Sequence, residues 1–170
     1  MGTVTKQPTS NTTPDAGQGG AAVTGNTNTG HASTTTTQVD MGTTSKTCLW
    51  TGFLPATGTI TSVTLKVDWA QDGTLSDGGA GTSNQFTIDY STNSGGAWSS
   101  LRNATQIQAS SSGTSQVSLS TTQDLTTVRV RDALIAAANA GETATMTATI
   151  SNIRIEVVTT GGGQPGAGMM

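Results

Sequence analysis

Carboxylates, amides and glycines gather between positions 68 and 84, and these residue types can bind a cation or a polar ligand. Asp68, Asp72 and Asp77 are spread through this stretch, and Asn84 closes it. Carboxylate and carbonyl oxygens are the ligands that Ca²⁺ prefers, although the spacing matches no strict motif such as the EF-hand. The stretch predicts either a structural calcium site or an ordinary solvated, turn-rich loop. Asp72, Asp77 and Asn84 are the candidate ligand contacts, and no cofactor other than this Ca²⁺ is expected.

The residues needed for hydrolysis are few. His31 is the only histidine and lies in a low-complexity stretch, so a Ser-His-Asp or Cys-His site requires that stretch to dock beside a nucleophile. Glu142 and Glu156 fall at opposite ends of one predicted strand, roughly 45 Å apart when extended, which excludes a glutamate pair flanking one glycosidic bond. An aspartate pair stays open but has no positive support. We therefore predict that the protein is not an enzyme.

Three tryptophans could stack on sugar rings or contact a partner. Trp69 and Trp98 are in register with apolar neighbours, which places both in the core. Trp50 alternates with Leu49, so if Leu49 and Phe53 are buried, Trp50 faces out toward a ligand or a partner subunit. Because exposed aromatic residues most often mark interfaces, partner contact is favoured over sugar binding.

A turn between positions 91 and 98 resembles the Asp-box hairpin, Ser-x-Asp-x-Gly-x-x-Trp, of sialidase-like propellers and other secreted β proteins. It reads Ser91-Thr92-Asn93-Ser94-Gly95-Gly96-Ala97-Trp98, with Asn93 in the place of the aspartate. We expect the short Asn93 side chain to bind the loop backbone, Gly95 to supply a positive φ and Trp98 to pack under the hairpin. One copy and a single tyrosine favour a folding device over a sialidase site.

The elements that must carry these residues alternate apolar and polar side chains with a period of two, as half-buried strands do. The clearest run is 60–69, in which Val63, Leu65, Val67 and Trp69 share one face. About eight strands separated by short turns predict an antiparallel β-sandwich, jelly-roll-like, with a polar edge strand at 34–40.

Two stretches depart from simple alternation. In the last strand, 142–158, the apolar parity changes from even to odd near Ser151 and Asn152, which predicts a bulge or a switch between sheets. The Ala-rich stretch 132–140, closed by Gly141, predicts a short helix. A long Gly-rich loop is expected over 71–84.

Composition divides the chain into three parts: an arm over 1–45, a β-sandwich domain over 46–159 and a flexible Gly-rich tail over 160–170. The arm contains no Leu, Ile, Phe, Trp or Tyr and is rich in Thr and Gly. Because so little apolar surface cannot offset the entropy of ordering, we expect the arm to be extended, mostly without regular structure, and to contact other chains more than its own domain.

Charge and cysteine content exclude several classes of protein. A net charge of -3 with seven Lys and Arg offers no basic surface for a phosphate backbone, so direct nucleic-acid binding is not expected. The first residues lack the apolar stretch of a secretion signal, and no segment approaches the roughly 20 apolar residues of a membrane span. Cys48 is the only cysteine, which excludes an internal disulfide, and it is expected to be a small buried strand residue.

From 47 to 158 the order of features resembles β-sandwich modules of tailed-phage virion proteins. The resemblance rests on Leu49-Trp50-Thr51-Gly52-Phe53-Leu54-Pro55, on Ile60-Thr61-Ser62-Val63, on Tyr90-Ser91 before the Gly-Trp hairpin and on Ile153-Arg154-Ile155-Glu156. It implies a non-enzymatic capsid decoration or cement protein, jelly-roll-like, that grips the shell through an arm while the sandwich stands on the surface.

The expected partners are the major capsid protein or other virion proteins. The protein is expected on the outer capsid surface of the virion, and in the host cytoplasm during assembly. A homo-oligomer, dimer or trimer, is expected, with Trp50 or the edge strand 34–40 at the contact. The alternative is a carbohydrate- or receptor-binding module of a tail fibre or bacterial surface adhesin, which would bind through Trp50, Asp72, Asp77 and Asn84.

Overall fold

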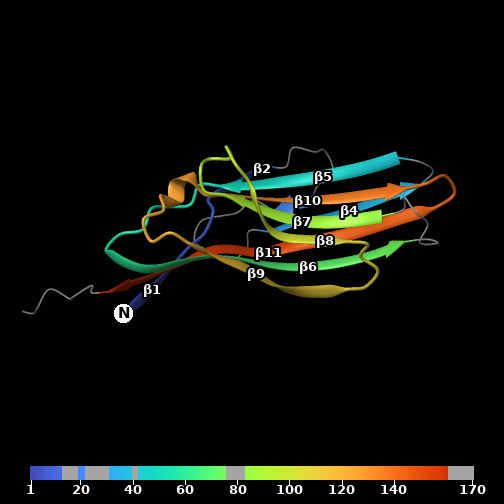
Figure 1. Ribbon diagram of the computed structural model, residues 1–170. Helices are drawn as coiled ribbons and strands as arrows, with labels where there is room; N and C mark the ends of the chain where they lie inside the picture. The colour runs from blue at the N-terminus through green and yellow to red at the C-terminus, as the bar shows by residue number, and fades with distance from the viewer. Residues whose placement is uncertain (13–18, 22–30, 40–41, 76–82, 161–170) are drawn as a thin grey trace, which may run out of the picture.

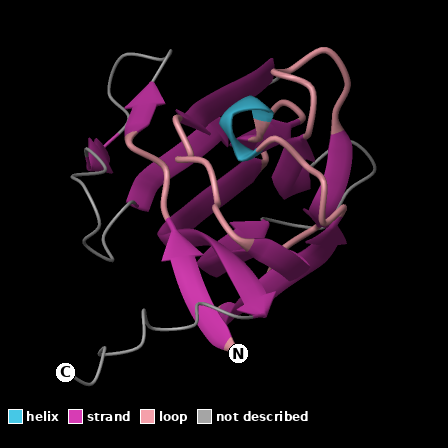
Figure 2. Ribbon diagram, turned by 90° about the vertical axis from the view of Figure 1, so that its left-hand side faces the viewer, coloured by secondary structure: helices cyan, strands magenta, loops and turns pink. Residues whose placement is uncertain are grey.

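Two antiparallel β-sheets pack face to face (Figures 1 and 2) in the computed structural model, which describes residues 1–12, 19–21, 31–39, 42–75 and 83–160. The six-stranded sheet contains β1 (Gly2–Lys6), β3 (Gly19–Ala21), β4 (His31–Val39), β6 (Thr59–Leu75), β9 (Ser111–Leu119) and β11 (Thr143–Thr160). The five-stranded sheet contains β2 (Ser10–Thr12), β5 (Gly42–Thr51), β7 (Ser83–Ser91), β8 (Ser99–Thr105) and β10 (Arg129–Ala138). The predicted all-β antiparallel sandwich is confirmed.

The order of strands is β3-β4-β11-β6-β9 in the first sheet and β2-β5-β10-β7-β8 in the second. Strand β1 pairs with the C-terminal part of β11, on the same edge that β4 pairs with nearer the start of β11. The only helical turn in the described residues is a 3-10 turn, η1 (Leu125–Thr127), in which the Asp124 side chain accepts a hydrogen bond from the Thr126 amide as an N-cap. No helix among these residues is long or apolar enough to cross a membrane.

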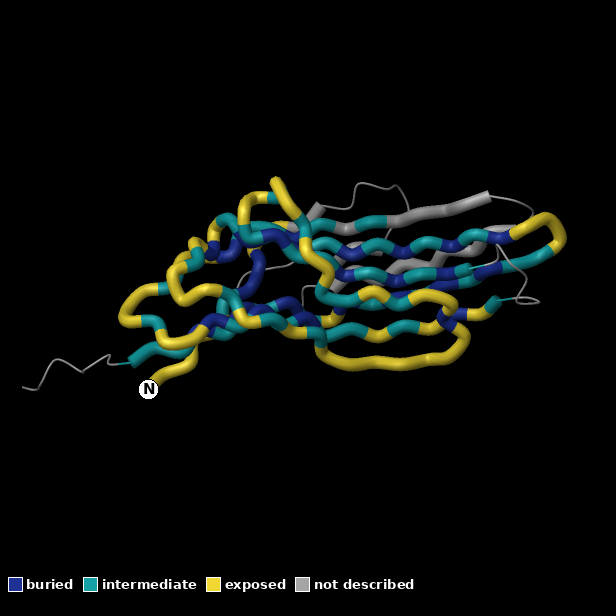
Figure 3. The backbone as a smooth tube through the Cα atoms, viewed as in Figure 1, coloured by how far each residue is buried: buried dark blue, intermediate teal, exposed yellow. Residues whose placement is uncertain are grey.

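The core lies between the sheets and follows the predicted alternation (Figure 3). Val63, Leu65 and Val67 of β6 are buried, and they pack in one cluster with Phe86 and Ile88 of β7. Burying a side chain of this size contributes about 1.5–3 kcal/mol, so the cluster is the main source of stability. Strand β6 is longer than expected, because Gln71 to Leu75 continue it and remain paired with β11.

The predicted irregularity in the last strand is confirmed. The pairing of β11 with β6 shifts register between Ile150 and Asn152. At the same point the other neighbour of β11 changes, from β4 on one side of the shift to β1 on the other. Gln7, which is almost fully buried, donates a hydrogen bond from Nε2 to Asn152 Oδ1 over 3.3 Å and ties the incoming chain to the bulge.

The helix predicted over 132–140 is wrong, because Arg129–Ala138 forms strand β10. This strand lies at the centre of its sheet, between β5 and β7, and buries Leu134, Ala136 and Ala138 on its inner face. Pairing on both edges outweighs the helix propensity of alanine. The small side chains suit a narrow part of the sandwich, where Ala136 and Ala138 pack against Ala144.

The N-terminal segment is extended, as predicted, but the expectation that it lacks regular structure is wrong for its described residues. Strands β1 and β4 pair with β11, and β2 pairs with β5. Main-chain hydrogen bonds hold these strands in the sheets without large side chains. A prediction based on the number of apolar residues leaves out this contribution to ordering. The boundary expected at 45/46 between arm and domain falls inside β5. The edge strand expected over 34–40 corresponds to β4. Of the tail expected over 160–170, residues 161–170 lie outside the described residues.

Candidate functional site

Trp50 is fully buried, so the prediction that it faces a ligand or partner is wrong. Its backbone pairs with Val130, another buried residue, whereas Leu49 pairs with Arg131 on the outer side. Phe53 is buried as well, because Gly52 has a φ of 81° and breaks the alternation after Thr51. Among the described residues, the indole nitrogen of Trp50 has no hydrogen-bond partner.

Asn84 is also fully buried and serves the fold. Its Nδ2 donates to the carbonyl of Ile107 over 2.7 Å and to that of Thr145 over 2.9 Å, while its Oδ1 accepts a short hydrogen bond from the Ile107 amide. Gly73 permits this approach, since a Cβ there would lie 2.6 Å from Asn84 Nδ2 and 2.7 Å from the Ile107 carbonyl. Asn84 thus fixes the connection between β8 and β9 and is not available to a surface ligand.

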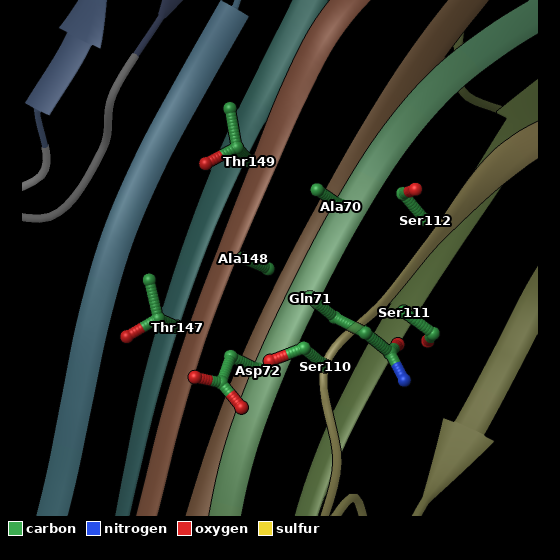
Figure 4. A pocket seen from close by; sticks show the side chains of 9 residues that line it. All are labelled: Ala70, Gln71, Asp72, Ser110, Ser111, Ser112, Thr147, Ala148 and Thr149. Carbon is green, nitrogen blue, oxygen red and sulfur yellow. The ribbon is translucent and has the colours of Figure 1, made fainter.

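Asp72 is the candidate that the structure places on the surface, beside a shallow groove of about 440 Å³ (Figure 4). The groove runs across β11, β6 and the start of β9 and is lined by Ala70, Gln71, Asp72, Ser110, Ser111, Ser112, Thr147, Ala148 and Thr149. Asp72 is opposite Thr147 in the sheet, and Ala70 lies between Thr149 and Ser112.

This groove offers mostly hydroxyls, with one carboxylate and one amide, and contains no aromatic side chain. The amide is already engaged, because Arg102 Nη2 donates a short hydrogen bond to Gln71 Oε1. Such a surface can exchange hydrogen bonds with a polyhydroxylated ligand, but it lacks the aromatic platform and the buried area that give small-molecule sites their affinity.

Asp68 belongs to a charged cluster farther along the same outer face, on β6 and β11. Arg154 pairs with Asp68 at 2.5 Å and with Glu156 at 3.2 Å, and Lys66 pairs with Glu156 at 2.8 Å. Thr114 donates a further hydrogen bond to Asp68 over 2.6 Å. The charges of Lys66 and Arg154 thus balance those of Asp68 and Glu156. The Asp68 carboxylate is engaged by its neighbours on the sheet.

The pKa values in this cluster reflect these contacts. Burial alone would raise the pKa of the Asp68 carboxyl, but hydrogen bonds from Thr114 and Arg154 outweigh it and hold the pKa below its ordinary value. The hydrogen bond from Lys66 lowers the pKa of Glu156, against a smaller opposing effect of burial. Within the described residues no group of three His, Cys, Asp or Glu side chains could hold a metal ion, and Asp77 lies outside them.

The hairpin over 91–98 has the geometry expected of a folding device. Asn93 Oδ1 accepts hydrogen bonds from the Ala97 amide and the Ser91 hydroxyl, each over 2.8 Å. Gly95 has a φ of 92° and lies against the Trp98 ring. Trp98 is half-buried, and the Arg131 guanidinium lies 4.2 Å from its ring centroid, so the indole does not offer an open platform for a sugar.

Comparison with known proteins adds no family to this description: no protein-family model matches the chain, and no curated protein matches it.

The groove beside Asp72 was only partly predicted from the sequence. Asp72 itself was singled out, but its threonine and serine neighbours come from β11 and β9, more than 35 positions away. A Thr at every second position over 143–149 was the available signal.

Proposed function

We propose that this chain is a non-enzymatic virion structural protein, a capsid decoration or cement protein that binds the outside of a phage capsid and bridges neighbouring subunits. The support from sequence is the resemblance of the sandwich to virion modules and the low charge of the chain. The support from structure is a surface at one end of the sandwich that suits attachment to a large partner.

This surface carries the exposed large apolar side chains of the described residues, and it is the observation on which the proposal rests. Met1 is 98% exposed, Val4 45% and Leu54 49%. Met1 precedes β1, Val4 lies in β1, and Leu54 lies in the turn 52–58. Thr159 lies near both segments: its Oγ1 donates a hydrogen bond to the Gly2 carbonyl over 3.5 Å, and a Cβ built at Gly58 would lie 3.9 Å from its Cγ2. We call Met1, Val4 and Leu54 the apolar end; in Figure 1, β1 and the N-terminus lie at the end of the sandwich opposite the β10–β11 turn.

Strand β1 contributes Val4 to the apolar end. Val4 pairs with Val157, which is fully buried, and therefore lies on the inner side of the sheet, yet nearly half of Val4 is exposed. In the described part of the chain, β11 is the only element that β1 contacts extensively. A second protein can cover the inner side of β1, and burial of apolar area across neighbouring subunits would hold the two together.

Removing the apolar end tests this proposal. Deletion of 1–6 keeps Gln7 and the rest of the sandwich, whereas deletion of all of 1–45 would also remove β2, β3, β4 and part of β5. We expect deletion of 1–6, or Val4→Ser combined with Leu54→Ser, to abolish rebinding to particles stripped of this protein. The matched control is Ala140→Ser, at the opposite end. Full retention of the truncated, folded protein on the particle contradicts the proposal.

A second candidate function is glycan binding by a tail-fibre or adhesin module, and the observation that favours it is the hydroxyl-lined groove beside Asp72. Asp72→Ala is the discriminating variant, with Asp124→Ala as a control because Asp124 caps η1 away from the groove. Binding of the wild type to a glycan array that is lost in Asp72→Ala and kept in Asp124→Ala, with deletion of 1–6 having no effect, places the adhesin function first.

A further inference from the structure

The two edge strands β8 and β9, joined by the connection 106–110, differ in how their free edges are protected. Proteins blunt exposed edges with bulges, inward-pointing charges, prolines or short strands, since an unprotected edge can pair with another chain. Strand β8 has two of these features. Its register against β7 shifts between Ile88 and Asp89, and its Arg102 points inward, with the guanidinium 3.4 Å from the Trp69 ring centroid.

Strand β9 has none of them. Its nine residues, Ser-Ser-Gly-Thr-Ser-Gln-Val-Ser-Leu, include no charged residue and no proline. They pair with β6 from Gln71↔Ser111 to Val63↔Leu119 without a shift in register. Among the described residues β9 is the last strand of its sheet, so its outer edge has no paired strand there, and residues 111–114 are all exposed. At the other side of the sandwich, β3 and β2 cover part of the edges of β4 and β5.

We infer that β9 is a self-association strand: two copies of this chain pair edge to edge through antiparallel β9 strands, related by a two-fold axis at Ser115. The inference does not depend on the proposed virion function. A strand of nine residues is about 30 Å long and can supply roughly one main-chain hydrogen bond per residue to its twin.

The side chains of β9 are compatible with this two-fold pairing. Centring the axis on Ser115 sets Gly113 opposite Val117 of the second copy and Ser111 opposite Leu119. Val117 and Leu119 are half-buried and pack against the core, so each gains cover opposite a small residue. On the outer face Ser112 meets Ser118, and Thr114 meets Gln116, which are uncharged and able to hydrogen-bond. No like charges oppose each other across the axis, as a self-complementary contact requires.

The pairing predicts a concentration-dependent dimer with a dissociation constant on the order of micromolar, because a single strand edge is smaller than a standard interface. Sedimentation velocity of the full chain over a range of concentrations measures it. Ser112→Lys combined with Ser118→Lys opposes like charges at two cross-strand positions and should weaken the dimer by at least about tenfold. Thr57→Lys combined with Ala140→Lys adds the same charge on exposed turns and should leave it unchanged.

A charge-complementation experiment distinguishes loss of strand pairing from misfolding of the lysine variant. Mixing the S112K/S118K variant with an S112E/S118E variant places Lys opposite Glu at both positions, so the mixture should form a heterodimer although each variant alone is monomeric. This rescue requires the register centred on Ser115. A wild type that stays monomeric at several hundred micromolar, a lysine variant that dimerises as the wild type does, or the lack of heterodimer in the mixture overturns the inference.

Discussion

Strands β1 and β6 belong to the same sheet and pair with the same strand, β11, but different forces hold them. Strand β6 has neighbours on both edges and buries Val63, Leu65 and Val67. Strand β1 has one paired neighbour, and positions 2 to 5 are all exposed. From this comparison we expect main-chain pairing to be enough to place a strand, and side-chain burial to determine how firmly the strand is held. A strand such as β1, which is held mainly by main-chain pairing, can contact a partner without loss of the core.

The largest expected effect comes from the interior of β6. Leu65→Ala should lower the free energy of unfolding by about 2–5 kcal/mol, because it leaves a cavity at a fully buried position. Val4→Ala in β1 is the matched control and should change stability by less than about 0.5 kcal/mol. Urea unfolding followed by tryptophan fluorescence measures both. Equal losses in the two variants would show that β1 is held as firmly as β6.

Asn84→Ala should cost about 2–3 kcal/mol, the next largest effect, because it removes the hydrogen bonds to the buried main-chain groups of Ile107 and to the Thr145 carbonyl. Asn103→Ala, at an exposed position of β8, is the control. The same urea experiment applies, and a near-neutral Asn84→Ala would contradict the assignment of Asn84 to the fold.

The hairpin predicts a smaller effect. Asn93→Ala removes the acceptor for the Ala97 amide and should cost about 1 kcal/mol. Asn93→Asp keeps an acceptor at both contacts and restores the residue of the Asp-box pattern, so it should be nearly neutral. Thermal unfolding of the two variants beside the wild type separates them, and equal losses would mean that the side chain does not organise the turn.

The smallest effect concerns the outer face of β6. The pKa of the Asp68 carboxyl is lower in the folded protein than its ordinary value, so its contribution to stability is present at neutral pH and is lost as the pH falls through the folded pKa. The wild type should therefore lose stability progressively as the pH falls below about 5, and Asp68→Asn should show a shallower loss. Urea titrations at several pH values test this, and parallel curves would count against it.

The sequence contained enough information for the sandwich, the interior of β6, the irregularity in β11 and the turn at Asn93, because each follows from local alternation or turn chemistry. It predicted a strand at β4 but did not predict β1 to β3, since main-chain pairing leaves no trace in composition. Trp50 was placed on the wrong face because the positive φ of Gly52 breaks the alternation, and β10 was taken for a helix because its two neighbours are distant in sequence. The groove beside Asp72 likewise needs the pairing of three strands.

Hydrogen–deuterium exchange of the wild type under native conditions tests most directly whether β1 is held by main-chain pairing alone. Peptides that cover β1 and peptides that cover the middle of β6 are compared in one experiment. We predict that the β1 amides exchange within the earliest time points by local opening, while the β6 amides are protected to the limit of global unfolding. Protection of β1 equal to that of β6 would contradict this account.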